Sequence, residues 1–331
     1  MKKDYVIDQQ TIRDLAGNLK TSVVELTKCG QHRSRQATMV GLGLQLSGLK
    51  RQLADPRQRA KLLARAKQDQ FALPKGLTLT SPVQEFRLAG RKVTTLNDRD
   101  AQQPVIVYLY GGAYLLPPAK QHWLFLDRLA QRSGARILVP DYPHLPEASA
   151  QDALAYLRRL SAALADQTPV SQITLMGDSA GGGLAAALVE DLGRDHLPMP
   201  GHLVLLSPWL DLSLQNPALA RYNKRDLLLD LGGLQALGKQ FAGALSPSDP
   251  RVSPLYGPVT NLRDVHLFVG TRELMCLDSI EFANRLTEAE VPVKLAIGRG
   301  LYHAYPLYQT PEGAAALKQI AAVVKGEDNY D

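Results

Sequence analysis

The chain has 331 residues, of which 45% are hydrophobic, so it can bury roughly three quarters of its unfolded surface in one large core or two modest ones. It contains no apolar run long enough to span a membrane, and its first residues, MKKDYVIDQQ, lack the apolar stretch of a secretory signal, so we expect a cytoplasmic protein. The two cysteines, Cys29 and Cys276, exclude a disulfide framework and a thiolate zinc site.

The net charge of +6 is concentrated near the start of the chain. Residues 1–76 carry 15 Lys and Arg against 6 Asp and Glu, whereas the remainder carries 23 against 26. The basic side chains of residues 57–67 surround Leu62, Leu63 and Ala66 at helical spacing, and no aromatic residue interleaves with them. This pattern favours the solvated face of an amphipathic helix over a nucleic-acid patch. We therefore predict that residues 1–76 form a helical segment and that nucleic acid is not a partner.

Short β-like runs alternate with amphipathic helical runs over residues 77–331. Strands that are nearly all apolar and alternate with helices predict a parallel sheet covered on both faces. The expected fold is α/β, with a doubly wound, mostly parallel eight-stranded sheet. A further helical stretch, at about 212–246, falls outside this alternation. The predicted strands are 83–89, 92–97, 105–110, 136–140, 172–176, 202–207, 265–270 and 293–298.

The loop after the fifth predicted strand carries the clearest catalytic signal. There QITLM runs directly into Gly177-Asp178-Ser179-Ala180-Gly181, a G-x-S-x-G motif between a strand and a small-residue helix. Ser179 must adopt a strained turn to present its hydroxyl, and glycines two positions away on either side remove Cβ atoms that would clash. A helix N-terminus also favours developing negative charge. Ser179 is therefore the predicted nucleophile, and a serine-bearing turn without catalysis is the alternative.

A serine nucleophile needs a histidine base, which in this strand order should follow the last strand. His303, in the loop GRGLYHAYP, is the histidine that does so. Two candidates, His122 and His144, precede the serine. His202 and His266 begin strands at the opposite end of the sheet, and His196 lies in a loop near Pro198. We therefore predict that His303 is the base.

The third catalytic group should follow VHLFVG, where the chain offers Glu273 and Asp278. Asp278 has a competing structural explanation, because Asp278 with Glu281 three residues later resembles a helix capping pair. Glu273 has no such structural role and lies just past the strand. Glu273 is the preferred acid, and Asp278 remains the alternative.

The stretch VYLYGGAYLLPP places two glycines directly after a strand. Attack by Ser179 creates an oxyanion that needs preorganised N–H donors. We assign these donors to Gly111, Gly112 and Ala113, with the amide of Ala180 opposite them. A simple tight turn is the alternative interpretation of the two glycines.

Seven segments between about residues 104 and 310 resemble the hormone-sensitive-lipase-like carboxylesterases of the α/β-hydrolase superfamily. They are VYLYGGAY, Asp141-Tyr142 with Pro146-Glu147, GDSAGG, SPWLDLS, SPLYGPVTNL, GTREL and GLYHAY. The resemblance implies an α/β-hydrolase domain over 77–331 and a helical cap built from residues 1–76 and the insertion at about 212–246. It also implies short-chain acyl esters as substrates. Two positions depart from the family motif: Tyr110 replaces a histidine that helps to hold the oxyanion loop, and Ala113 replaces a glycine. The Tyr110 hydroxyl is expected to brace the loop in place of that histidine, with different hydrogen-bond partners; a ring that merely packs is the alternative.

The predicted function is serine carboxylester hydrolysis through an acyl-enzyme intermediate, on a small-molecule ester. Neither a cofactor nor a metal is implied. An amidase or peptidase with the same triad, and a non-catalytic ligand-binding protein on this scaffold, are the alternatives. The sequence specifies neither the physiological substrate nor the oligomeric state, and a homo-oligomer is one alternative to a monomer. Candidate residues of the substrate pocket are Tyr110, Tyr114, Leu115, Asp178, Trp209 and Leu210.

Overall fold

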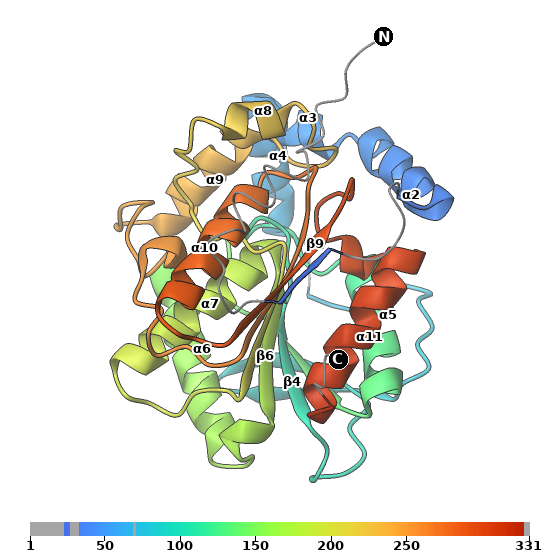
Figure 1. Ribbon diagram of the computed structural model, residues 1–331, viewed down its shortest axis with the longest axis vertical. Helices are drawn as coiled ribbons and strands as arrows, with labels where there is room; N and C mark the ends of the chain where they lie inside the picture. Colours follow the sequence, from blue (N-terminus) through green and yellow to red (C-terminus); the bar gives the residue numbers. More distant parts are fainter. Residues whose placement is uncertain (1–22, 27–32, 69–70, 328–331) are drawn as a thin grey trace.

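A nine-stranded sheet forms the centre of the computed structural model, which describes residues 23–26, 33–68 and 71–327 (Figure 1). The strand order is β1-β9-β8-β7-β6-β4-β5-β3-β2. The pairs β2–β3 and β3–β5 are antiparallel and the other six pairs are parallel, so the sheet is mostly parallel, as predicted. The strands are β1 (Val23–Leu26), β2 (Val83–Leu88), β3 (Arg91–Leu96), β4 (Val105–Leu109), β5 (Arg136–Pro140), β6 (Ile173–Asp178), β7 (His202–Leu206), β8 (Val265–Gly270) and β9 (Val293–Gly298).

Helices cover both faces of the sheet. Helices α5 and α11 lie together on one face, and α6, α7 and α10 lie on the other (Figure 1). This two-sided cover explains why the parallel strands are almost continuously apolar. The helices are α2 (Arg35–Leu46), α3 (Leu49–Ala54), α4 (Pro56–Ala66), α5 (Lys120–Ser133), α6 (Ala150–Ala165), α7 (Ser179–Arg194), α8 (Leu219–Asn223), α9 (Leu231–Ala242), α10 (Cys276–Glu288) and α11 (Pro311–Lys325).

All eight predicted strands are present, with ends within two residues of the expected ones. The ninth strand, β1, lies in the segment that was expected to be helical, and for these four residues that expectation is wrong. β1 has the sequence VVEL and pairs in parallel with the free edge of β9. Because strand formation here depends on a partner 271 positions away, local patterning could not reveal it.

The remaining described part of residues 1–76 is helical where the pattern predicted a helix. In α4, Ala66 is buried, Leu62 and Leu63 are half-buried, and the basic side chains face outward. Asp55 caps this helix by accepting hydrogen bonds from two backbone N–H groups of the first turn. The amphipathic pattern predicted for this helix is therefore confirmed, except that Arg59 is half-buried and donates to the carbonyl oxygen of Leu53.

Five helices gather at one end of the molecule: α2, α3 and α4 from the start of the chain, and α8 and α9 from the stretch after β7 (Figure 1). Helices α3 and α9 approach so closely that a Cβ atom on Gly233 would lie 2.4 Å from the carbonyl oxygen of Leu53. The ammonium group of Lys50, on α3, donates a hydrogen bond to the carbonyl oxygen of Asp226, 2.7 Å away. The two helical stretches that stood outside the strand–helix alternation therefore pack against each other.

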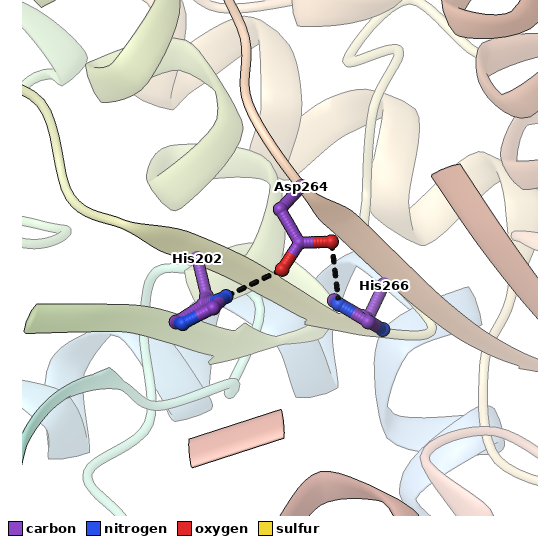
Figure 2. A group of neighbouring side chains, drawn as sticks. All are labelled: His202, Asp264 and His266. Atoms are coloured by element: carbon purple, nitrogen blue, oxygen red, sulfur yellow. Dashed lines mark hydrogen bonds and ion pairs between the residues drawn. The ribbon is translucent and has the colours of Figure 1, made fainter. Parts of the chain in front are cut away.

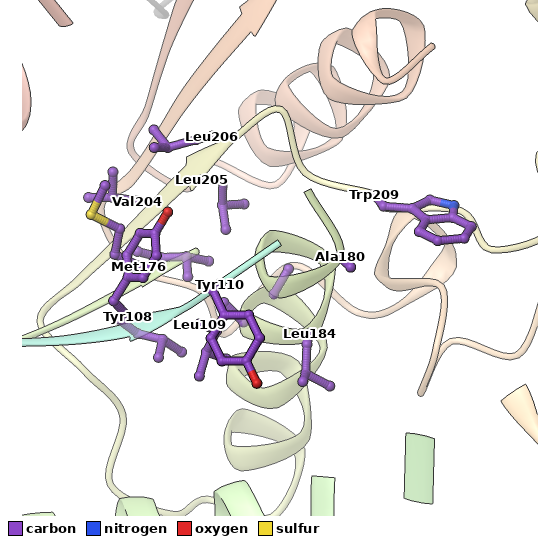
Figure 3. Packing of buried hydrophobic residues seen from close by; sticks show 14 of the residues in the cluster. Tyr108, Leu109, Tyr110, Met176, Ala180, Leu184, Val204, Leu205, Leu206 and Trp209 are labelled. Atoms are coloured by element: carbon purple, nitrogen blue, oxygen red, sulfur yellow. The ribbon is translucent and has the colours of Figure 1, made fainter. Parts of the chain in front are cut away.

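Apolar residues of the central strands pack against α7, which carries the G-x-S-x-G motif at its start. Figure 3 shows Leu109 of β4, Met176 of β6 and Leu205 of β7 beside Ala180 and Leu184 of α7. All five side chains are buried. This packing fixes α7, and with it Ser179, at the carboxyl edge of the sheet. None of the helices in the described ranges is long and apolar enough to cross a membrane.

Candidate active site

Ser179 lies at the junction of β6 and α7, in a strained backbone conformation with φ of 53°. A Cβ atom on Gly177 would lie 2.5 Å from the carbonyl oxygen of Gly181, and one on Gly181 would lie 2.0 Å from that of Leu109. Real Cβ atoms do not approach oxygens so closely, so both positions require glycine. The predicted geometric reason for the two motif glycines is confirmed.

His303 and Glu273 meet in the loops after β9 and β8. Nδ1 of His303 lies 2.6 Å from Oε2 of Glu273, and both side chains are buried. The carboxylate accepts the Nδ1 proton, which leaves the lone pair on Nε2 available to receive another proton. Burial by itself would lower the pKa of His303, but the charge and hydrogen bond of Glu273, with the charges of Asp226 and Asp178, raise it above its ordinary value. Asp178 directly precedes Ser179, so the charge of the residue next to the serine also acts on this imidazole.

Ser207 holds the acid and the histidine loop together, a role that the sequence did not predict. Its hydroxyl donates to Oε1 of Glu273 at 2.7 Å and accepts from the backbone N–H of Ala304 at 2.9 Å. The backbone N–H of Gly270 donates to the same carboxylate oxygen at 2.6 Å. Ser207 could have been found from its position, because it directly follows β7 at the carboxyl edge of the sheet, where the other candidates were sought.

Asp278 is not the helix cap that the sequence suggested. Helix α10 begins at Cys276 and its capping position is Met275, so Asp278 is the third residue of the helix. The side chain is buried, and one of its carboxylate oxygens has no hydrogen-bond partner among the described residues. Burial, followed by the charges of Asp211 and Glu281, raises the pKa of Asp278 to about 7. The structure gives no hydrogen bond between Asp278 and His303, and this favours Glu273 as the acid.

Asp226 connects the α8–α9 stretch to the loop that carries the acid. One carboxylate oxygen accepts hydrogen bonds from the N–H groups of Leu228 and Leu229, and the other accepts from Leu274, the residue after Glu273. Burial raises the pKa of Asp226, and the nearby His303 and the three N–H donors counteract this. Nothing in the local sequence RDLLLD predicts the link to the acid loop, because the third partner, Leu274, is 48 positions away.

The loop after β4 lies against the nucleophile, but Gly111 does not serve as an oxyanion donor in this structure. Its N–H group donates to Oδ1 of Asp178 at 2.8 Å, so it is already occupied. A Cβ atom on Gly111 would lie 2.9 Å from Cβ of Ser179, which shows how close the loop comes to the serine. The N–H groups of Gly112 and Ala113 have no hydrogen-bond acceptor within the described ranges. Of the predicted donors in this loop, these two are therefore available.

The Asp178 carboxylate holds this loop in place through hydrogen bonds. Besides Gly111, its carboxylate accepts a hydrogen bond from the hydroxyl of Tyr108 at 2.6 Å and lies 3.3 Å from Nε2 of His122. Nδ1 of His122 accepts the N–H of Ala119, so the ring proton lies on Nε2 and points at the carboxylate. Burial would raise the pKa of Asp178, but His122, Tyr108 and Gly111 lower it overall. Asp178, predicted as a pocket residue, instead points into the protein, and His122 supports it.

Tyr110 does not hold the loop through its hydroxyl, contrary to expectation. The hydroxyl is buried and has no hydrogen-bond partner in the described part of the chain, while the ring stacks between Phe71 and Tyr142, with ring centroids 5.7 and 4.6 Å away. The loop is held instead by Tyr142, whose hydroxyl donates to the carbonyl oxygen of Tyr110 at 2.6 Å. A tyrosine ring is longer than imidazole, so it extends past the loop into an aromatic layer.

The other candidate pocket residues form tightly packed core. Tyr114 stacks on Phe241 with ring centroids 3.8 Å apart, and the Trp209 ring lies 5.5 Å from the Tyr114 ring. Leu115 and Leu210 are buried as well. An apolar pocket lies elsewhere, under α6 and α7, and shares no residue with the candidate catalytic groups. It is lined by Val107, Leu157, Leu160, Ser161, Leu164, Val170, Ile173, Leu175, Leu188, Leu192, Pro198 and Pro200.

Comparison with known proteins agrees with this fold. A family model described as alpha/beta hydrolase fold matches residues 106–307. An esterase of Acinetobacter venetianus is 31% identical over 246 residues, which cover 73% of this chain and 81% of the relative. An acetyl-hydrolase of Streptomyces hygroscopicus is 30% identical over 226 residues, covering 66% of this chain and 75% of the relative.

Solved structures show the same relationship. A homologue of hormone-sensitive lipase, EstE7 from a metagenome library, aligns with a TM-score of 0.75 and 25% identity over 90% of this chain and all of that one. A hormone-sensitive lipase from a metagenome library aligns with a TM-score of 0.72 and 26% identity, over 88% of this chain and 98% of that one. The chain therefore belongs to the alpha/beta hydrolase family and, within it, to the carboxylesterases related to hormone-sensitive lipase.

Proposed function

We propose that this protein hydrolyses short-chain carboxylic esters through an acyl-enzyme formed on Ser179. The observations that carry the proposal are the buried contact between His303 and Glu273 and the strained strand-to-helix turn that holds Ser179. His303 takes the proton of the Ser179 hydroxyl as the serine attacks the ester carbonyl, and then passes that proton to the departing alcohol. Water activated by the same imidazole releases the acid. Glu273 keeps the imidazole oriented and stabilises its positive charge.

The oxyanion is assigned to the N–H groups of Gly112, Ala113 and Ala180. Ala180 lies in the first turn of α7, where backbone N–H groups have no acceptor within the helix. The first two belong to a loop with φ values of 143° and 55°, an unusual backbone that Asp178 and Tyr142 hold in place. Such preorganised donors are each worth roughly 3 to 4 kcal/mol of the barrier.

The two helical stretches at the end of the molecule are proposed to form a cap over this site. A Cβ atom on Gly41, in α2, would lie 3.2 Å from Leu227 and 3.5 Å from the ring of Tyr302, the neighbour of His303. Phe71 likewise covers Tyr110 of the oxyanion loop. A cap packed this closely limits the length of the acyl group. The relative named acetyl-hydrolase is consistent with a short chain.

The proposal is tested by following hydrolysis of p-nitrophenyl esters of increasing acyl length, with the matching p-nitroanilides as amide substrates. Turnover is expected to be fastest for acyl chains of about two to six carbons and to be abolished by Ser179→Ala. Ser248→Ala, which changes an exposed serine, is the matched control. A serine-directed phosphonate should add its mass to the native chain and not to Ser179→Ala.

Full activity in the Ser179→Ala protein would exclude the serine mechanism. Faster turnover of emulsified long-chain triglycerides than of soluble butyrate esters would contradict the short-chain assignment. Faster turnover of the anilides than of the esters would assign the same triad to amide hydrolysis instead.

A further inference from the structure

Two histidines and an aspartate meet at the edge of the sheet opposite the catalytic loops. Figure 2 shows both imidazole rings directed at the carboxylate of Asp264. Nδ1 of His202 lies 2.5 Å from one carboxylate oxygen, and Nε2 of His266 lies 3.0 Å from the other. All three ligand atoms lie within 4.8 Å of one another. This arrangement has no part in the ester-hydrolysis mechanism described above.

The cluster joins the starts of two neighbouring strands. His202 is the first residue of β7, and His266 is the second residue of β8. The catalytic groups follow the opposite ends of the same strands, roughly 13 Å away at about 3.3 Å per residue over four steps. An ion at the cluster would therefore be too far from Ser179 to take part in its chemistry.

The backbone of Asp264 is constrained by its own conformation and by the adjacent strand. Its φ of 37° lies in the left-handed region, and its carbonyl oxygen accepts the N–H of Leu203. An aspartate carboxylate is ionised at neutral pH, so Asp264 offers an anionic oxygen ligand with one imidazole nitrogen on each side of it.

Imidazole nitrogen and carboxylate oxygen are the ligands that a borderline divalent cation such as Zn²⁺ prefers. Ligand atoms around a tetrahedral Zn²⁺ with bonds of about 2.0 to 2.1 Å lie roughly 3.3 Å apart. Nε2 of His266 already lies at nearly this distance from a carboxylate oxygen of Asp264. Nδ1 of His202 lies closer to the other oxygen and must move away from it by less than about 1 Å. The His202 side chain is 25% exposed and Asp264 is 31% exposed, whereas His266 is 1% exposed. The site therefore has a buried base and an open side through which an ion can enter.

We propose that His202, Asp264 and His266 bind a divalent transition-metal cation, with Zn²⁺ as the ion to which this ligand set is best suited and solvent completing the coordination. The bound ion links the starts of β7 and β8 and stabilises the fold. Lys294 is the neighbour of His266 in the sheet register, and Arg263 directly precedes Asp264. These positive charges weaken cation binding, so we expect an affinity in the micromolar range.

The sequence predicted no metal site, since His202 and Asp264 are 62 positions apart and neither lies in a metal-ligand spacing motif. The folded sheet brings them together because β7 and β8 are adjacent and parallel.

The test uses the full chain after removal of metal with EDTA. Equilibrium dialysis against micromolar Zn²⁺, followed by metal analysis, should give about one bound equivalent, and the melting temperature should rise with Zn²⁺ concentration. Co²⁺ in place of Zn²⁺ should give the intense visible bands of a tetrahedral nitrogen and oxygen site. His202→Ala and, independently, Asp264→Asn should lose the bound equivalent and the thermal shift. Asn tolerates the left-handed backbone at position 264, so that variant keeps the local shape.

His196→Asn is the matched control, because His196 is an exposed histidine with a φ of 53° outside the cluster. This variant should retain the bound ion, and circular dichroism should show that all three variants are folded. The proposal is wrong if the native chain binds no ion under these conditions. It is equally wrong if His202→Ala and Asp264→Asn bind as much Zn²⁺ as the native chain, since the ion would then lie elsewhere, for example at His303.

Discussion

The structure predicts opposite outcomes for two chemically identical changes in neighbouring tyrosines. Tyr142→Phe removes a buried hydroxyl that donates to the carbonyl oxygen of Tyr110 at 2.6 Å. Tyr110→Phe removes a buried hydroxyl that has no hydrogen-bond partner among the described residues. Both changes leave the stacked rings in place. Only the first should therefore disturb the loop that carries Gly112 and Ala113.

The magnitude follows from the burial of both partners. Losing a typical hydrogen bond costs about 0.5 to 1.5 kcal/mol, and leaving a buried carbonyl oxygen without a donor raises the total to about 1 to 3 kcal/mol. Tyr142→Phe should lower the free energy of unfolding by that amount. If about 1 kcal/mol of this loss destabilises the transition state relative to the bound substrate, kcat falls roughly fivefold. KM should change little, because the displaced donors act on the oxyanion rather than on the bound ester.

Tyr110→Phe should leave kcat unchanged and should slightly raise the free energy of unfolding, because an unsatisfied buried hydroxyl is removed. Steady-state hydrolysis of p-nitrophenyl acetate and urea unfolding of both variants provide the comparison. A fall in kcat for Tyr110→Phe with none for Tyr142→Phe would refute the assignment of the brace to Tyr142.

Three further outcomes follow from the site. Glu273→Gln should lower kcat at least a hundredfold and shift the acidic limb of the kcat/KM profile to lower pH, because the charge that raises the pKa of His303 is gone, whereas Asp278→Asn should leave both nearly unchanged. Burial raises the pKa of Asp278 from 3.8 to about 7, so the native state holds a proton that the unfolded state loses between these values, and stability falls as pH rises through this window. Asp278→Asn should accordingly raise the melting temperature more at pH 8 than at pH 4. The corresponding difference in the free energy of unfolding is at most about 4 kcal/mol, and an equal gain at both pH values would show that the pKa of Asp278 is not its cause. Ser207→Ala should reduce kcat roughly tenfold with KM nearly unchanged, since one charge-assisted hydrogen bond to Glu273 is lost, and an unaltered enzyme would show that Gly270 alone positions the carboxylate.

The sequence by itself determined the features that depend on near neighbours. Apolar runs between helical segments located the eight strands, because alternation of buried strands and amphipathic helices is a local pattern. The turn around Ser179 was equally predictable, since the steric need for Gly177 and Gly181 arises within a few residues and from the adjacent strand. The order of strands then indicated which loops would meet at one edge, and so pointed to Glu273 and His303.

Only the tertiary structure decided which polar groups are occupied and which are free. Gly111 was expected to be an oxyanion donor, but its N–H is taken by a carboxylate 67 positions away. Ser207, Asp226 and Asp264 likewise each acquire one partner from a distant part of the chain, namely Glu273, Leu274 and His202, respectively. Hydrogen bonds and charges act over a few ångströms in space, and local periodicity carries no information about which distant group will occupy that space. The shape of a turn can be foreseen from its own residues, whereas the occupancy of a donor or acceptor depends on the packing of the whole sheet.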